Sequence, residues 1–122
     1  MKKIRAYVAS SALVLLSMIA PALAEEVALG QKAFQRCSAC HSTHQIKPGP
    51  ALGGIIGRPA GSIEGFRYSP AMRSSGLVWD EATLDRFLTS PREVVPKTTM
   101  TVSVPKPEDR QNIIAYLKSL SQ

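Results

Sequence analysis

The sequence has few aromatic residues and only two cysteines. Of its 122 residues, three are Phe, three are Tyr and one is Trp. Ordering a domain of about 100 residues costs on the order of 100–200 kcal/mol of conformational entropy, and few large apolar side chains are present to offset it. Chains this small often take up a disulfide, a metal or a cofactor. We therefore expect something besides side chains to fill part of the interior.

The chain also lacks a block of basic residues outside its N-terminus. The formal net charge is +6, but Lys2, Lys3 and Arg5 contribute three of the 15 Lys and Arg. Residues 25–122 carry 12 basic and 9 acidic residues, a net charge of +3. We therefore expect no nucleic-acid partner. No Ser/His/Asp set, paired carboxylates or phosphate-binding loop indicates a hydrolase or a transferase.

Residues 1–24 have the pattern of a secretory signal peptide. The basic residues are followed by an uncharged run, 6–24, and residues 22–24 (Ala-Leu-Ala) match a small-residue cleavage site. We predict cleavage after Ala24 and export, in a bacterium to the periplasm, with residues 25–122 as one domain. The alternative is an uncleaved membrane anchor, because the uncharged run has borderline length for a span.

Apolar periodicity predicts three to four helices and no strand ladder, hence an all-α fold. Residues 27–38 place apolar or small side chains on one face with a helical period. Asp80 can cap a helix over 81–90 that Pro91 stops. A last helix is expected to begin near Pro107, where proline and acidic residues favour a helix start.

Long loops are expected between the helices. Residues 48–61 contain eight Gly and Pro in 14 positions, a density that excludes a regular helix or strand. Their apolar residues need burial, so we predict an ordered loop that approaches a neighbour closely. A short helical turn is expected near Pro70, and residues 91–107 are expected to be extended.

Cys37, Cys40 and His41 form C-x-x-C-H, the attachment signature of c-type haem. The two thiols would form thioethers with the haem vinyl groups, and the adjacent histidine would bind the iron. A thioredoxin-like dithiol expects a βαβ context that the sequence lacks. A zinc site needs about four ligands, and a plain disulfide would not need His41. The pattern therefore favours covalent haem.

The second iron ligand is predicted by elimination. His44 lies only three residues after His41, so we expect it on the same side of the ring, as a surface histidine. Beyond the leader, the methionines are Met72 and Met100. Met72 follows a short turn and is expected to serve as packing. Met100 lies in a Pro/Thr loop between two predicted helices, which can pass across the opposite haem face, so Met100 is the predicted ligand.

The ordered motifs from Gly30 to Leu120 resemble those of class I c-type cytochromes, the soluble mitochondrial and bacterial monohaem type. The resemblance rests on Gly30-x-x-x-Phe34, Cys37-x-x-Cys40-His41, Gly49-Pro50-x-Leu52, Gly57-Arg58-x-x-Gly61, Tyr68, Gly76-Leu77-Val78-Trp79, Pro96-x-Thr98-x-Met100 and Ile113-Ile114-Ala115-Tyr116-Leu117. It implies a cytochrome c fold wrapped around one covalently bound haem c and its iron.

The resemblance also implies roles for individual residues. His41 and Met100 would be the axial iron ligands, and the Pro50 carbonyl would accept a hydrogen bond from the His41 ring. Gly30 and Phe34 would pack against the last helix. The donors around the haem propionates would be Arg58, Tyr68, Trp79 and Thr98. A ring of basic residues near the haem edge would steer acidic partners: Arg36, Lys47, Arg92, Lys97 and Lys106.

These expectations predict a periplasmic one-electron carrier between redox proteins rather than an enzyme. A six-coordinate His/Met iron leaves no open position for a substrate. We expect a monomer whose donor and acceptor are redox proteins, with membrane redox complexes among the candidates. One alternative is a cytochrome subunit tightly bound to a periplasmic dehydrogenase or oxidase complex. Another is a five-coordinate haem enzyme or gas sensor.

Overall fold

The computed structural model describes residues 10–121, and the predicted leader residues Lys2, Lys3 and Arg5 lie outside the described residues. The described part is helical, with an isolated bridge between Pro59 and Val78 as its β pairing. The all-α prediction is confirmed. The helices, in chain order, are α1 (Ser10–Ala33), a 3₁₀ turn (Phe34–Cys37), α2 (Pro70–Arg73), α3 (Glu81–Thr89), α4 (Pro91–Val94) and α5 (Pro107–Ser119).

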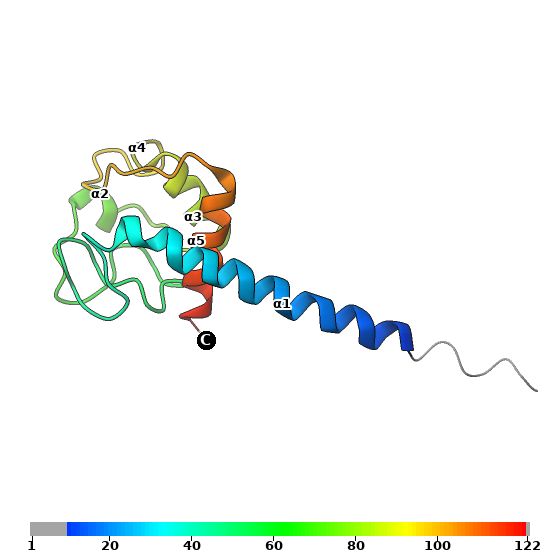
Figure 1. Cartoon of the computed structure of the whole chain (residues 1–122). Coiled ribbons are helices and arrows are strands. Elements are labelled where there is room, and N and C mark those ends of the chain that lie inside the picture. Colours follow the sequence, from blue (N-terminus) through cyan, green and yellow to red (C-terminus); the bar gives the residue numbers. More distant parts are fainter. Residues whose placement is uncertain (1–9, 122) are drawn as a thin grey trace, which may run out of the picture.

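Helix α1 is longer than the sequence predicted. It begins at Ser10 and passes through Pro21, and its α-helical part ends at Ala33. Pro21 stays within the helix, because the strong helix formers on both sides offset the hydrogen bond that proline removes. Figure 1 shows the N-terminal part of α1 projecting away from the other elements. None of the helices in residues 10–121 combines the length and the apolar character that a membrane span requires.

The C-terminal part of α1 crosses α5 in close contact. Gly30 is buried, and a Cβ atom at this position would lie 1.8 Å from the Asn112 carbonyl oxygen. One turn later, the rings of Phe34 and Tyr116 pack with centroids 5.4 Å apart. The expected packing of Gly30 and Phe34 against the last helix is confirmed. Glycine is required here because the two backbones approach too closely for any side chain.

Helix α3 begins at the predicted cap and ends earlier than predicted. The Asp80 side chain accepts a 2.7 Å hydrogen bond from the Thr83 backbone N–H, which lowers the pKa of this exposed carboxyl. The helix ends at Thr89, and Ser90 (φ −152°, ψ 87°) is not helical, because a residue before a proline disfavours the helical conformation. Pro91 then opens the one-turn helix α4. The expectation that 91–107 is extended throughout is wrong at this turn, since proline suits the first helical position.

The glycine- and proline-rich segment is an ordered loop, as predicted. Its backbone bonds to two neighbouring stretches: Gly53 N–H donates to the Thr43 carbonyl at 2.8 Å, and Gly57 N–H donates to the Trp79 carbonyl at 2.8 Å. Trp79 N–H returns a 3.0 Å bond to the Arg58 carbonyl. Gly57 has a φ of +84°, which glycine adopts readily. These bonds hold the loop against two other non-helical segments, around Thr43 and Trp79.

Replacing Gly30 by alanine should destabilise the protein by about 1–3 kcal/mol, because the added methyl group overpacks the α1–α5 crossing. Chemical denaturation followed by far-UV circular dichroism measures this. Gln31→Ala is the matched control, since Gln31 is the exposed next residue of the same helix. Equal stability of the two variants would contradict the close approach of α1 and α5.

Candidate functional site

A cavity of about 430 Å³ lies between the helices and the long loops. Its volume is in the range of small-molecule and cofactor sites, roughly 300–1,000 Å³. The wall combines the end of the first helical segment, the loop after His41, the inner faces of α3 and α5, and the segment around Met100. Most of the core packs around this space, so the core and the cavity wall share residues such as Phe34, Leu84 and Ile113.

All of the site residues predicted from the sequence line this one cavity. The structure brings together the C-x-x-C-H residues, the second predicted ligand and the polar residues expected around them, although they span more than half of the chain. They are Cys37, Cys40, His41, Pro50, Arg58, Tyr68, Trp79, Thr98 and Met100.

The two cysteines lie on a tight turn that the 3₁₀ helix starts. The N–H groups of Cys40 and His41 both donate to the Cys37 carbonyl, at 3.1 and 2.8 Å. The two cysteines form no disulfide with each other; Cys37 is half-buried and Cys40 is exposed. Burial raises the pKa of the Cys37 thiol; Arg36 opposes this and Cys40 adds to it. The turn thus presents both sulfurs and the imidazole to one cavity.

The His41 ring is held by the loop that follows it. Its Nδ1 atom lies 2.8 Å from the Pro50 carbonyl oxygen, so the contact expected between these residues is present. A carbonyl only accepts, so Nδ1 carries the proton and Nε2 keeps the lone pair that a metal would bind. Gly49 packs on the ring: a Cβ there would lie 2.5 Å from Cε1 of His41. The loop therefore sets both the tautomer and the position of the imidazole.

Two thioether side chains line the cavity. Met100 is partly buried, and Met72, on α2, is 9% exposed. The sequence assigned Met72 to packing, and the structure places it within the cavity wall as well as within the core. His44 is exposed and is not part of this wall, as expected for a surface histidine.

The Arg58 side chain lines the cavity and also bonds to the backbone of its own loop, residues 48–61. Its guanidinium donates to the Gly53 carbonyl at 3.2 Å and to the Ala51 carbonyl at 2.9 Å. Burial lowers its pKa, and Tyr68 partly opposes this. The Tyr68 hydroxyl accepts a 3.3 Å bond from the Ile63 N–H. A guanidinium has five N–H donors, so these carbonyl contacts leave donors for a further group.

Sequence reasoning named the apolar stripes of the helices without placing them at the site. Five buried side chains from these stripes form the inner wall: Leu84, Phe87 and Leu88 from α3, and Ile113 and Leu117 from α5. Ser69, which caps α2, was missed and also lines the cavity. Helical periodicity identifies a buried face, but it does not distinguish a face against other side chains from one against a cofactor.

The cytochrome c family model matches residues 27–121, most of the chain. The chain belongs to the cytochrome c family. Cytochrome c2 of Rhodomicrobium vannielii is 47% identical over 92 residues, which cover 72% of this chain and 74% of that protein. Cytochrome c2 of Blastochloris viridis is 38% identical over 112 residues, 88% of each chain. The solved structure of cytochrome cH from Methylobacterium extorquens matches with a TM-score of 0.74 and 41% identity, covering 76% of this chain and 97% of that one.

These findings confirm the resemblance to class I c-type cytochromes and the cytochrome c fold. The protein is a monohaem electron carrier, with one covalently bound haem c and its iron, and it transfers electrons between redox proteins rather than acting as an enzyme. The dithiol, zinc and disulfide interpretations of the cysteine pair are thereby excluded, and so is a haem enzyme.

The residues around the cavity fit this cofactor. The wall offers two adjacent thiols, an imidazole whose Nδ1 already bonds a carbonyl, and a thioether from a distant segment. The remaining wall is mostly apolar, which suits a porphyrin face. Gly49 leaves room beside the imidazole where a side chain would collide with the ring.

Gly49→Ala should shift the His41 ring, because the new methyl group cannot fit beside Cε1. We expect an altered redox potential and altered haem absorbance, together with a stability loss of about 1–3 kcal/mol. Spectroelectrochemical titration measures the first two. Gly54→Ala is the control: φ is +74° and no atom lies within 4 Å of its Cβ, so it should cost stability through backbone strain alone. An unchanged potential in Gly49→Ala would contradict this role of Gly49.

Proposed function

We propose that residues 1–24 are a signal peptide removed after Ala24, and that residues 25–122 act in the periplasm as a soluble, monomeric electron carrier. The leader pattern supports export. Residues 20–26 are exposed, so a peptidase can reach this part of α1 once it is unwound. Cleavage there would spare the contacts of Gly30 and Phe34 with α5.

Within this proposal, Cys37 and Cys40 would form the thioethers, and His41 and Met100 would hold the iron. The observation that carries it is that these residues line a single cavity. Bound haem supplies an iron centre that changes its charge by one electron. The soft sulfur of Met100 would favour the reduced iron and raise the potential relative to a second histidine. The hydrogen bond from His41 Nδ1 to the Pro50 carbonyl fixes the ring orientation on the other side.

Arg58, Tyr68, Trp79 and Thr98 are proposed to surround the haem propionates. All line the cavity, and each carries an N–H or O–H group. Trp79 and Thr98 are 7% and 6% exposed. Donors buried to this degree stabilise a carboxylate more strongly than water-exposed donors do.

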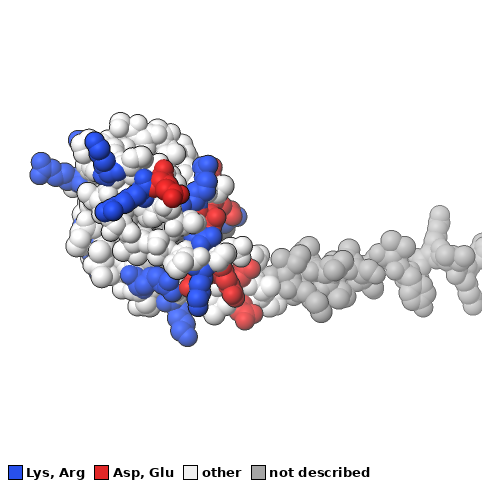
Figure 2. Space-filling view, turned by 90° about the horizontal axis from the view of Figure 1, so that it is seen from above, with Lys and Arg blue, Asp and Glu red and all other residues white. Residues whose placement is uncertain are grey.

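The alternative, a subunit held tightly by a redox enzyme, is favoured by the modest surface charge. Figure 2 shows Lys and Arg scattered over the displayed face, with acidic side chains between some of them. Two residues of the predicted ring are engaged within the chain: Arg36 pairs with Asp109 at 3.0 Å, and Lys47 donates to the Ser38 carbonyl at 2.9 Å. Arg92, Lys97 and Lys106 are exposed.

Replacing the two cavity methionines separately tests the iron ligand. Met100→Ala should keep the haem attached but abolish the long-wavelength sulfur–iron absorption band of the oxidised protein and lower the potential. Met72→Leu should keep the band, because leucine conserves the volume of a packing residue at a cost of less than about 1.5 kcal/mol. Absorption spectra of both oxidised variants decide the assignment. Loss of the band in Met72→Leu alone would make Met72 the ligand.

Salt dependence tests whether the protein docks by charge. For a freely diffusing carrier, the rate of electron transfer to its partner should fall as salt rises, since charge attraction is screened within about 8–10 Å near physiological ionic strength. Lys97→Glu should slow association at low salt without shifting the potential. Stopped-flow oxidation at several ionic strengths measures both effects.

Lys32→Glu is the matched control, because Lys32 is an exposed residue of α1 outside the predicted ring. It should slow association less than Lys97→Glu does. A rate that is independent of salt, with Lys97→Glu equal to the unmodified protein, would favour the tightly bound subunit. Co-migration of the haem with a larger protein in size-exclusion chromatography of native extract would support the same conclusion.

A further inference from the structure

The segment that carries Met100 has little support of its own. Among residues 10–121, no hydrogen bond joins residues 99–103 to any other part of the chain. All of these residues except Met100 are exposed, and Val102 is 58% exposed. The position of the Met100 sulfur therefore depends on how the two ends of the segment are held.

The N-terminal end is held by a short series of turns. Val95 is 2% exposed, and its N–H donates to the Pro91 carbonyl at 2.9 Å. Thr98 N–H donates to the Val95 carbonyl at 3.0 Å. Between them, Lys97 has a φ of +67°, a left-handed conformation that costs a residue with a side chain about 1–2 kcal/mol. At this end, Val95 and Thr98 are buried, whereas the backbone at Lys97 is strained.

The C-terminal end is held by α3 and α5 together. Val104 is 1% exposed, and its N–H donates to the Leu88 carbonyl near the end of α3 at 2.7 Å. The Arg110 guanidinium, from α5, donates through one nitrogen, Nη1, to the carbonyls of Val104 at 2.9 Å and Pro105 at 3.0 Å. These bonds begin four residues after Met100.

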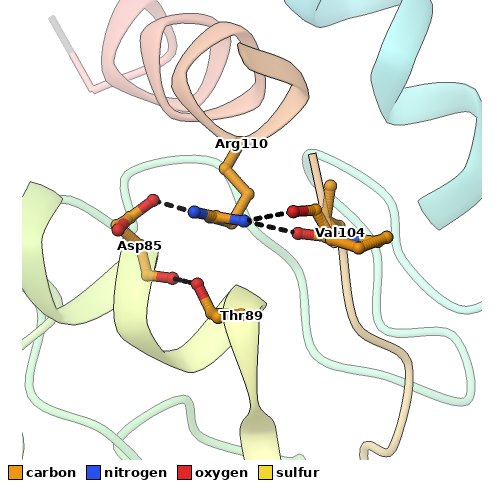
Figure 3. Close-up of polar contacts among 5 residues, drawn as sticks. Asp85, Thr89, Val104 and Arg110 are labelled. Carbon is orange, nitrogen blue, oxygen red and sulfur yellow. Dashed lines mark hydrogen bonds and ion pairs between the residues drawn. The ribbon is translucent and has the colours of Figure 1, made fainter. Parts of the chain in front are cut away.

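Arg110 is itself oriented by a carboxylate. Its Nε donates to Asp85 Oδ1 at 2.7 Å, and Figure 3 shows the guanidinium between Asp85 of α3 and the Val104 segment. The Arg110 side chain is 9% exposed and the Asp85 side chain 44%. The planar guanidinium donates in fixed directions, so turning it away from Asp85 would also misalign the bonds to the two carbonyls. Arg110 does not line the cavity.

We infer that Arg110, oriented by Asp85, is a positioning residue for Met100: it holds the C-terminal end of the segment 99–103 and so limits departure of the Met100 sulfur from the iron. This rests on the proposed role of Met100 as the axial ligand. When the clamp formed by Asp85, Arg110 and the two carbonyls is weakened, the segment should leave the iron more often while the rest of the fold persists.

Imidazole binding to the oxidised holoprotein tests this inference, because imidazole can take the iron position only when Met100 has left it. The apparent affinity is then proportional to the fraction of molecules with Met100 off the iron. Asp85→Ala should raise the apparent affinity roughly tenfold, the effect of losing one charge-assisted hydrogen bond of moderate strength. Alanine favours helices, so α3 should persist. Arg110→Lys should also raise the affinity, because an ammonium lacks the guanidinium fork.

Glu81→Gln is the matched control. Glu81 pairs with Lys118 and so joins the same two helices, α3 and α5, but this ion pair is exposed and does not contact the Met100 segment. Its imidazole affinity should equal that of the unmodified protein. Denaturation followed by circular dichroism is measured for all variants, to confirm that each is folded under the conditions of the titration.

Met100→Ala separates this inference from the proposed ligand. If Met100 is the ligand, Met100→Ala should bind imidazole most tightly, and adding Asp85→Ala should raise the affinity no further. If Met100→Ala leaves the affinity unchanged, the ligand assignment is wrong. If Met100→Ala raises the affinity but Asp85→Ala and Arg110→Lys do not, the ligand assignment stands and the positioning role is overturned. An equal increase in Glu81→Gln would also overturn it, since general loosening of α3 and α5 would then suffice.

Discussion

A short chain must enclose a cavity of about 430 Å³, and the rest of the structure follows from this constraint. Helices α1 and α5 cross in tight contact, where Gly30 allows the two backbones to approach closely and the Phe34 and Tyr116 rings pack together. Long loops then extend around the cavity with few regular hydrogen bonds of their own. The haem c of this family supplies apolar contacts that the six aromatic residues of 25–122 could not supply by themselves. Cofactor binding and folding therefore use the same side chains.

The two predicted iron ligands, His41 and Met100, are held in place in different ways. On the His41 side, the ligand follows directly after the cysteines, and Gly49 and Pro50 hold its ring. On the Met100 side, the ligand lies in an exposed segment fixed only at its ends. With Met100 as the proposed second ligand, its position would depend on contacts different from those that hold the His41 ring. Such a division suits an electron carrier, in which small changes around the sulfur alter the potential.

Much of the site could be predicted because its chemistry is encoded locally. C-x-x-C-H fixes three groups within five residues, and beyond the leader the chain offers only His44, Met72 and Met100 as candidates for the second ligand. The cap at Asp80 and the start of α5 at Pro107 also depend on neighbouring residues alone. The errors arose where context overrides a local signal. Helix α1 begins at Ser10, well before the predicted start at residue 27, and Pro91 begins the one-turn helix α4 as well as following α3.

The sequence by itself determined the residue types at the site, the helical faces that must be buried and the covalent attachment of a cofactor, because each is expressed in residues only a few positions apart. The tertiary structure alone decided which of these residues share one wall. It placed Met72 beside the cavity, brought Gly49 against the His41 ring, and joined Arg110 to Asp85, 25 residues away, and to the carbonyls of Val104 and Pro105. These contacts depend on how helices and loops pack in space, and no local pattern specifies the partner of a side chain that bonds across elements.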